Sequence, residues 1–173
     1  MSSNWSIQGE KDPEVVRPDW SPAHPPQMDG VVARQVANVL TGNGYLTEIW
    51  RGDWNLDDLP VGQVFQRVLE PKAASGWHVH AVTTDRLFCG HGRILVALYD
   101  GRLDSPTHGK AIDFRLGSER PAVIVVPPGV WHGVRNLFSE PSLFLNVVDV
   151  AYDYEDPDHI RLPLDTPLIP YQL

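Results

Sequence analysis

Two short segments decide the fold: Gly76-Trp77-His78-Val79-His80 and Pro127-Pro128-Gly129-Val130-Trp131-His132. Asp85 follows the first segment after four residues, and Asn136 stands four positions after His132. In the first segment one apolar residue separates two histidines, and side chains two positions apart on a strand point to the same face of a sheet. This segment therefore predicts a strand that turns both imidazoles inward or both outward.

Short apolar runs separated by turn residues make up most of the remaining chain. Ten of them are rich in Val, Ile, Leu, Phe and Trp and predict strands: Val31–Val36, Tyr45–Trp50, Gln63–Glu70, Gly76–Ala81, Arg86–Gly90, Arg93–Asp100, Ala111–Leu116, Ala122–Val126, Trp131–Leu137 and Ser142–Val148. Sixteen prolines and fourteen glycines leave little room for long helices. Helical turns are expected only at Thr47-Glu48 and Asn55–Leu59. The pattern is typical of an all-β sandwich or barrel.

The length of 173 residues suits a single domain with one core. Residues 1–29 contain five prolines and little apolar periodicity. They predict an extended N-terminal arm, with a disordered tail as the alternative. Trp5 and Trp20 are placed to anchor this arm on the core or on a partner subunit. Residues 30–173 form the barrel domain, and their acidic and then proline-rich end, residues 154–173, is expected to wrap around it.

Charge and cysteine content exclude several classes of protein. The net charge of −8 and the predicted pI of about 5.2 argue against nucleic-acid or anionic-membrane binding. No apolar run reaches the roughly 20 residues of a membrane-spanning helix, and the N-terminus lacks the pattern of a secretory signal. Cys89 is the only cysteine, which rules out an intramolecular disulfide and favours a reducing cytoplasm.

The spacing H-x-H-x4-D-x6-G, followed by P-x-G-x2-H-x3-N, resembles the two motifs of the cupin superfamily. This resemblance implies an all-β jelly-roll barrel in a single domain. In metal-binding cupins, the equivalents of His78, His80, Asp85 and His132 hold one divalent ion, although glutamate is usual where Asp85 stands. Three imidazoles and one carboxylate suit Fe, Mn, Ni, Zn or Co.

Six further segments occur in a fixed order along residues 30–171. They are Gly30-Val31-Val32, Gly44-Tyr45-Leu46-Thr47-Glu48, Gly76-Trp77-His78, Ser105-Pro106-Thr107-His108-Gly109-Lys110, Val126-Pro127-Pro128-Gly129-Val130-Trp131-His132-Gly133 and Asp165-Thr166-Pro167-Leu168-Ile169. In this order they resemble the dTDP-4-dehydrorhamnose 3,5-epimerase family, which shares the cupin barrel and works without metal. The resemblance implies a keto-sugar substrate, nucleotide-linked, and no cofactor.

Catalytic positions of that family fall on three residues of this chain. Its base falls on His78, its orienting aspartate on Asp165, and the histidine near its substrate on His132. Histidine suits the removal of a proton beside a ketone because its pKa lies near the working pH. A carboxylate bonded to the other ring nitrogen fixes the tautomer. The resemblance therefore implies a His78–Asp165 dyad.

Other positions of the family carry different residues here. Its pyrophosphate-binding arginine falls on Ser75, and its catalytic tyrosine falls on Asn146. Its lysine falls on Asp85 or Arg86. We expect Arg86, Asn146 and Trp131 to contact the substrate. The tyrosine replaced by Asn146 is the family's catalytic acid. Three residues of this chain are candidates to take over that role: Tyr99, Tyr152 and Arg115.

Three functions remain open at this point. The first is an epimerase or isomerase acting on a keto-sugar with the His78–Asp165 dyad and no cofactor. The second is a metal-dependent cupin enzyme with His78, His80, Asp85 and His132 as ligands. The third is a non-catalytic cupin that binds a sugar or another metabolite. In each case the expected partner is a small molecule, and the family resemblance implies a homodimer.

Overall fold

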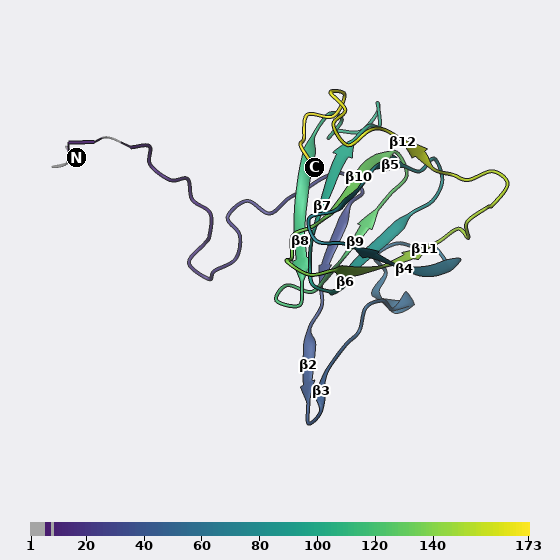
Figure 1. The fold of residues 1–173 in the computed structure, drawn as a ribbon, viewed down its shortest axis with the longest axis horizontal. Helices are drawn as coiled ribbons and strands as arrows, with labels where there is room; N and C mark the ends of the chain where they lie inside the picture. Colours follow the sequence, from purple (N-terminus) through teal and green to yellow (C-terminus); the bar gives the residue numbers. More distant parts are fainter. Residues whose placement is uncertain (1–5, 8) are drawn as a thin grey trace.

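Two five-stranded antiparallel sheets pack face to face in the computed structural model, which describes residues 6–7 and 9–173 (Figure 1). The first sheet contains, in spatial order, β1 (Val32–Gln35), β9 (Ala122–Val126), β6 (Asp85–His91), β11 (Ser142–Val148) and β4 (Gln63–Leu69). The second contains β12 (Ile160–Arg161), β5 (Ala74–Val79), β10 (Val130–Asn136), β7 (Arg93–Asp100) and β8 (Ala111–Gly117). A separate hairpin of β2 (Asn38–Thr41) and β3 (Gly44–Thr47) projects from the body.

Alternating apolar side chains form the core between the two sheets. On β7, Ile94, Val96 and Leu98 point inward and are fully buried, in contact with residues such as Leu87 and Ile124 of the first sheet. Apolar residues line this interior along most of the sandwich. At one end they give way to the histidines, so the core fixes the strands that carry the polar site.

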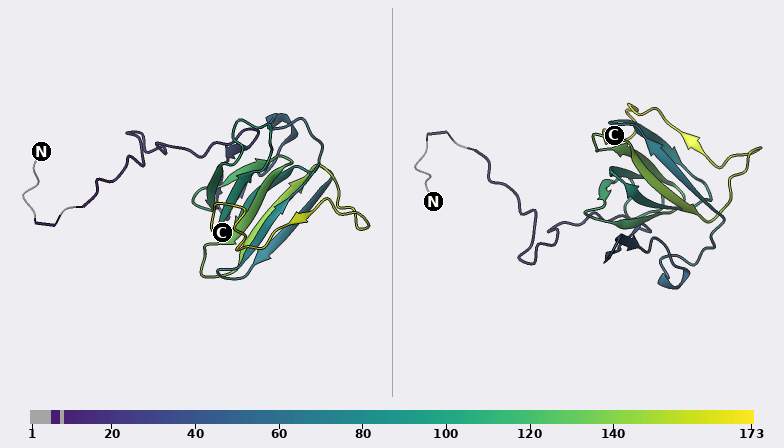
Figure 2. Two further views of the ribbon diagram at one scale, coloured as in Figure 1. Left: turned by 90° about the horizontal axis from the view of Figure 1, so that it is seen from above. Right: turned by 60° about the horizontal axis from the view of Figure 1, so that its bottom comes forward.

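The C-terminal segment covers the outer face of the second sheet. Trp77, Leu95 and Ala97 point outward from their strands, yet they are buried because Ile169 and Leu173 pack on them. The views in Figure 2 show this segment returning across the sheet after β12. This packing explains why β7 reads as a continuous apolar run, since both of its faces are covered.

The expected all-β jelly-roll of the cupin type is confirmed, and all ten predicted strands are present. The strands β2 and β12 were not predicted. β12 has only two residues and owes its strand conformation to pairing of Ile160 with Val79 of β5. The single 3₁₀ turn of the described chain is Gly52–Trp54, just before Asn55–Leu59, one of the two segments expected to form a helical turn. The turn ends at Asn55, whose backbone lies in the left-handed region.

Residues 9–29 run away from the barrel as an extended arm (Figures 1 and 2), and Trp5 lies outside the described residues. Trp20 is 83% exposed, so within this chain it does not anchor the arm on the core. Ala23 and Met28 are buried where the arm reaches the body. Within the described residues, no helix is long and apolar enough to cross a membrane.

Candidate active site

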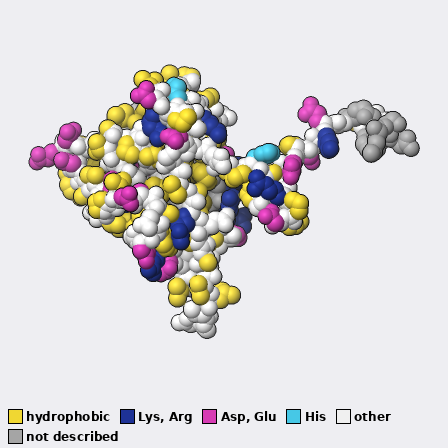
Figure 3. Space-filling view, turned by 180° about the vertical axis from the view of Figure 1, so that it is seen from behind, with side chains coloured by type: hydrophobic (Ala, Val, Ile, Leu, Met, Phe, Trp, Pro, Cys, Tyr) yellow, Lys and Arg dark blue, Asp and Glu magenta, His cyan; other side chains and the backbone are white. Residues whose placement is uncertain are grey.

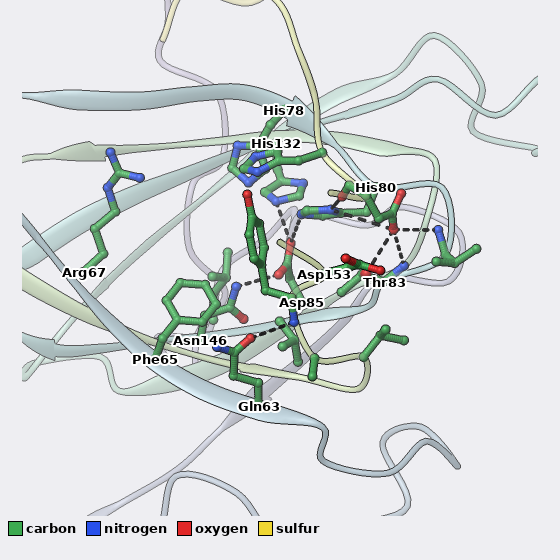
Figure 4. A pocket seen from close by; sticks show the side chains of 18 of the residues that line it. Gln63, Phe65, Arg67, His78, His80, Thr83, Asp85, His132, Asn146 and Asp153 are labelled. Carbon is green, nitrogen blue, oxygen red and sulfur yellow. Dashed lines mark hydrogen bonds and ion pairs between the residues drawn. The ribbon is translucent and has the colours of Figure 1, made fainter. Parts of the chain in front are cut away.

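Four potential donor side chains converge at one end of the sandwich: His78, His80, Asp85 and His132 (Figure 4). Their donor atoms all lie within 4.8 Å of one another. His78 on β5 stands directly opposite His132 on β10 in the ladder, and His80 follows two residues later on the same face. Asp85 opens β6 on the facing sheet. The register of two strand pairs and the packing of two sheets thus build the cluster.

The Asp85 carboxylate occupies the centre of this cluster. Its Oδ2 lies 2.7 Å from Nε2 of His132 and 3.3 Å from Nε2 of His80. Asn146 on β11 donates from Nδ2 to the other oxygen at 2.5 Å. The His132 contact has the distance of an ion pair without the alignment of a hydrogen bond, so both of its atoms stay unsatisfied as hydrogen-bonding groups among the described residues.

In both His80 and His132, the ring nitrogen on the side away from Asp85 faces a backbone carbonyl. Nδ1 of His132 lies 3.0 Å from the carbonyl oxygen of Val130, and Nδ1 of His80 contacts that of Asp158. Each ring therefore has an oxygen acceptor at both nitrogens. A neutral imidazole has only one N–H, so in each neutral ring one of the two facing oxygens receives no proton. A second proton or a cation at Nε2 would satisfy that contact.

Burial and charge shift the titration of these groups in different directions. Burial opposes ionisation of Asp85, but the charge and contact of His132 outweigh it and hold the pKa of this carboxyl well below its usual range. Burial also opposes protonation of His80, but the bond and charge of Asp85 raise its pKa overall. Burial, followed by the charge of His132, lowers the pKa of His78 far below its usual value. His78 is therefore neutral at physiological pH.

A cavity of about 650 Å³ opens beside the cluster. Gln63, Phe65 and Arg67 line it from the inner face of β4, and Figure 4 shows Arg67 at the side away from Asp85. The segment between β11 and β12 closes another side with Tyr152 and its neighbours. This volume and the mixed polar and aromatic lining are typical of a pocket for a small organic ligand.

Asp165 does not meet His78, so the expected dyad is not formed in the described chain. Asp165 is exposed in a turn closed by the hydrogen bond from Thr166 N to Pro163 O, and it does not line the cavity. The carboxylate next to the imidazoles is that of Asp85. The resemblance led to the wrong partner because the turn after β12 directs Asp165 to solvent.

Two expected substrate contacts also lie elsewhere. Arg86 follows Asp85 on β6 and points to the opposite face, where its fully buried side chain pairs with Asp57 and lies over the ring of Trp50. Trp131 precedes His132 on β10 and packs in the outer apolar cluster. Neither residue lines the cavity, because neighbours on a strand face opposite sides. Asn146 does line the cavity, where it holds Asp85.

His159 lies outside the motifs identified in the sequence, yet it belongs to the site. Its ring lies 4.7 Å from that of His78 and 5.0 Å from that of His80, measured between centroids, and it lines the cavity. Burial, followed by the charge of Arg161, lowers the pKa of His159 to about 4. His159 immediately precedes β12 and Arg161 ends it, and both line the cavity. Their spacing in the sequence does not show that this segment pairs with β5.

Comparison with known proteins matches this site and fold to one family. The family model of dTDP-4-dehydrorhamnose 3,5-epimerase matches residues 27–169. The chain belongs to the dTDP-4-dehydrorhamnose 3,5-epimerase family. Membership makes it an enzyme of the isomerase class, as the resemblance implied.

Two curated relatives and one solved structure show how close this epimerase-family chain is to known members. It is 36% identical over 141 residues to the probable low-salt glycan biosynthesis epimerase Agl13 of Haloferax volcanii, covering 81% of this chain and 90% of the relative. It is 30% identical to the spore coat polysaccharide biosynthesis protein SpsL of Bacillus subtilis, and the match covers 80% of this chain and 91% of SpsL. The crystal structure of a dTDP sugar isomerase from Desulfovibrio desulfuricans superposes with a TM-score of 0.78 at 26% identity. The match covers 83% of this chain and 90% of the isomerase.

Proposed function

We propose that this protein epimerises a nucleotide-linked keto-sugar in glycan biosynthesis, with His78 as the base that removes the proton beside the ketone. The observation that carries the proposal is a neutral, largely buried imidazole in a cavity of about 650 Å³, on the fold of an epimerase family. The relatives Agl13, a probable glycan biosynthesis epimerase, and SpsL, a spore coat polysaccharide biosynthesis protein, support a role in glycan biosynthesis.

His78 is the candidate for this step because its imidazole lines the cavity and is unprotonated, and its lowered pKa makes it a weaker base than a free histidine. The C–H bond next to the ketone breaks, its proton moves to a ring nitrogen of His78, and its electron pair delocalises onto the ketone oxygen as an enolate. Return of a proton to the other face of the same carbon inverts the centre. The step needs no redox partner, since the proton removed and the proton returned balance.

The trio of His80, Asp85 and His132 sets the charge around that base. Nε2 of His80 and Nε2 of His132 both face the single carboxylate of Asp85, whose bond and charge raise the pKa of His80. Positive charge within a desolvated site stabilises an enolate and keeps His78 unprotonated before the reaction. This arrangement replaces the direct carboxylate partner that Asp165 does not supply.

Cationic side chains at the cavity wall fit a substrate with phosphate groups. Arg67 of β4 and Arg161 of β12 both line the cavity. Neither makes an ion pair with any other described residue. Free guanidinium groups bind phosphate oxygens through several N–H donors. We assign them to the diphosphate of the nucleotide-sugar, with Phe65 and Tyr152 offering aromatic surfaces to its base or sugar ring.

A divalent metal ion is the second candidate, and one observation favours it. Nε2 of His132 and Oδ2 of Asp85 are buried and lack hydrogen-bond partners in the described chain, although they are 2.7 Å apart. Three imidazoles and a carboxylate therefore fit Fe, Mn, Ni, Zn or Co. His78, His80, Asp85 and His132 would hold the ion, which would polarise a substrate oxygen as a Lewis acid. A ring nitrogen of His78 that binds metal does not accept a proton.

A homodimer is the proposed assembly. The β2–β3 hairpin exposes a set of apolar side chains on both strands: Val39, Leu40, Tyr45 and Leu46. Figure 3 shows hydrophobic atoms gathered on this projection, away from the body. An exposed apolar hairpin and an extended arm that bears Trp20 are typical of surfaces that a second subunit covers. Sedimentation equilibrium of the full chain tests this assembly.

The proposed reaction is tested by product analysis. The protein is incubated with a panel of nucleoside-diphosphate 4-keto-6-deoxy sugars, and proton NMR follows the configuration at the carbons flanking the ketone. Formation of an epimer supports the proposal. Ligand-induced stabilisation without turnover on any member of the panel supports a binding protein instead.

A further inference from the structure

An enolate needs a hydrogen-bond donor at its oxygen, and the most obvious donors of this site are already engaged. His80 and His132 each direct one ring nitrogen at Asp85 and the other at a backbone carbonyl. An N–H that already faces a carboxylate or a carbonyl is not available to a substrate oxygen without loss of that contact. Nε2 of His132 makes no aligned hydrogen bond, but Oδ2 of Asp85 lies 2.7 Å away and competes with a substrate oxygen for any proton on it. A residue without such a neighbour is therefore the better candidate for the donor.

His159 presents a ring nitrogen with no such engagement. Its Nε2 is buried and has no hydrogen-bond partner anywhere in the described chain. Its ring contacts that of the base, His78, at 4.7 Å between centroids. Buried polar atoms without partners are uncommon in folded proteins and indicate that a ligand or water completes the bond. The ring of His159 therefore stands next to the group that takes the proton.

The neighbouring residue fixes His159 in this place. The Asp158 carboxylate accepts hydrogen bonds from the backbone N–H groups of Ala81, Val82 and Thr83 at 2.7–3.0 Å. Pairing of Ile160 with Val79 then continues the segment as β12. His159 lies between the anchored Asp158 and the paired Ile160. Both of its neighbours are therefore fixed to β5 or to the loop that follows it, and its ring lies beside those of His78 and His80.

We propose that His159 is a catalytic residue that donates a hydrogen bond from Nε2 to the ketone oxygen of the substrate. As His78 removes the proton, negative charge grows on that oxygen and the bond from His159 strengthens. The inference rests on the proposed epimerase function and adds the group that stabilises the enolate. Preorganised donors of this kind act mainly on the transition state.

The test compares two nearly isosteric replacements, His159→Gln and His159→Met. Glutamine keeps an N–H donor, whereas methionine has none. His108→Met serves as the control, because His108 is exposed and lies outside the cavity. Thermal unfolding followed by circular dichroism checks the fold of each variant. Steady-state kinetics on the epimerised substrate give kcat and KM separately.

We expect His159→Met to lower kcat about 100-fold with KM near that of the wild type. His159→Gln is expected to recover most of this loss, and His108→Met is expected to match the wild type. If His159→Met keeps the wild-type kcat, or if both His159 variants lose kcat equally, the inference about His159 is overturned but the proposed epimerase function is not. A wild-type enzyme that turns over no keto-sugar overturns the proposed function and this inference together.

Discussion

Nε2 of His132 lies 2.7 Å from Oδ2 of Asp85, and both side chains are only 2% exposed. Nε2 of His80 approaches the same oxygen at 3.3 Å. Because the far nitrogens of both rings face carbonyl oxygens, either protons or a metal ion between the rings and the carboxylate would satisfy these contacts. Which of the two is present determines whether His78 is free to act as a base.

Replacement of His80 by glutamine separates these two cases. Under the epimerase account, His80→Gln keeps activity within about tenfold of the wild type, because His80 tunes the site and touches no reacting atom. The protein as purified without chelator then contains less than stoichiometric transition metal by elemental mass spectrometry. One equivalent of metal in the wild type, lost in both His80→Gln and Asp85→Asn, contradicts this expectation and favours the metal enzyme.

The Arg86–Asp57 pair contributes to stability and is separate from the site. Asp57 binds the buried guanidinium through two contacts, of 2.6 and 2.8 Å. Asp57→Asn is expected to lower the free energy of unfolding by about 3 kcal/mol, because it leaves a buried charge without its counter-ion. Urea denaturation measures this loss.

Glu119→Gln is the matched control for that substitution. It breaks the exposed pair with Arg93, and we expect a loss below about 1 kcal/mol. The kcat of folded Asp57→Asn protein stays at the wild-type value, because Arg86 faces away from the cavity. A specific fall in kcat without loss of stability would show that Arg86 contacts substrate after all.

Asp158 predicts an acid-dependent loss of stability. Burial opposes its ionisation, but the N–H donors of Val82, Ala81 and Thr83 outweigh burial and lower its pKa from 3.8 to about 2. A carboxyl with a lower pKa in the folded state stabilises the fold above its unfolded pKa and loses this contribution as pH falls through the folded pKa. The loss therefore falls between about pH 4 and about pH 2.

Urea unfolding of the wild type and of Asp158→Asn tests that assignment. At pH 7 the variant is expected to be less stable by about 1–3 kcal/mol, because the hydrogen bonds to a charged acceptor are lost. The difference between the two proteins is expected to shrink as the pH approaches 3. A difference that stays constant across this range would mean that Asp158 is not the group that titrates.

The strand pattern predicted the barrel because the inner residues of each strand are apolar and alternate regularly. The same alternation located the cluster, since it placed His78 and His80 on one face. Applied more strictly, it would also have excluded Arg86 and Trp131, which are strand neighbours of the inward-facing Asp85 and His132. The resemblance to a family supplied those two residues, and strand geometry contradicts them.

His159 and Asp165 lay beyond such reasoning for a different physical reason. β12 has two residues, and its position depends on the free edge of β5, where Ile160 pairs with Val79, which stands 81 positions earlier in the chain. No local pattern of the sequence encodes a contact of this kind. The turn from Pro163 to Thr166 likewise decides that Asp165 faces solvent.

Deuterium wash-in tests the central claim most directly. The wild type, His78→Asn and the exposed control His108→Asn are incubated in D₂O with the nucleotide-linked keto-sugar panel, and mass spectrometry measures label at the carbons next to the ketone. We expect incorporation by the wild type and the control, slowed at least about 100-fold in His78→Asn. Incorporation at the wild-type rate without His78, or no incorporation by the wild type across the panel, would contradict the account.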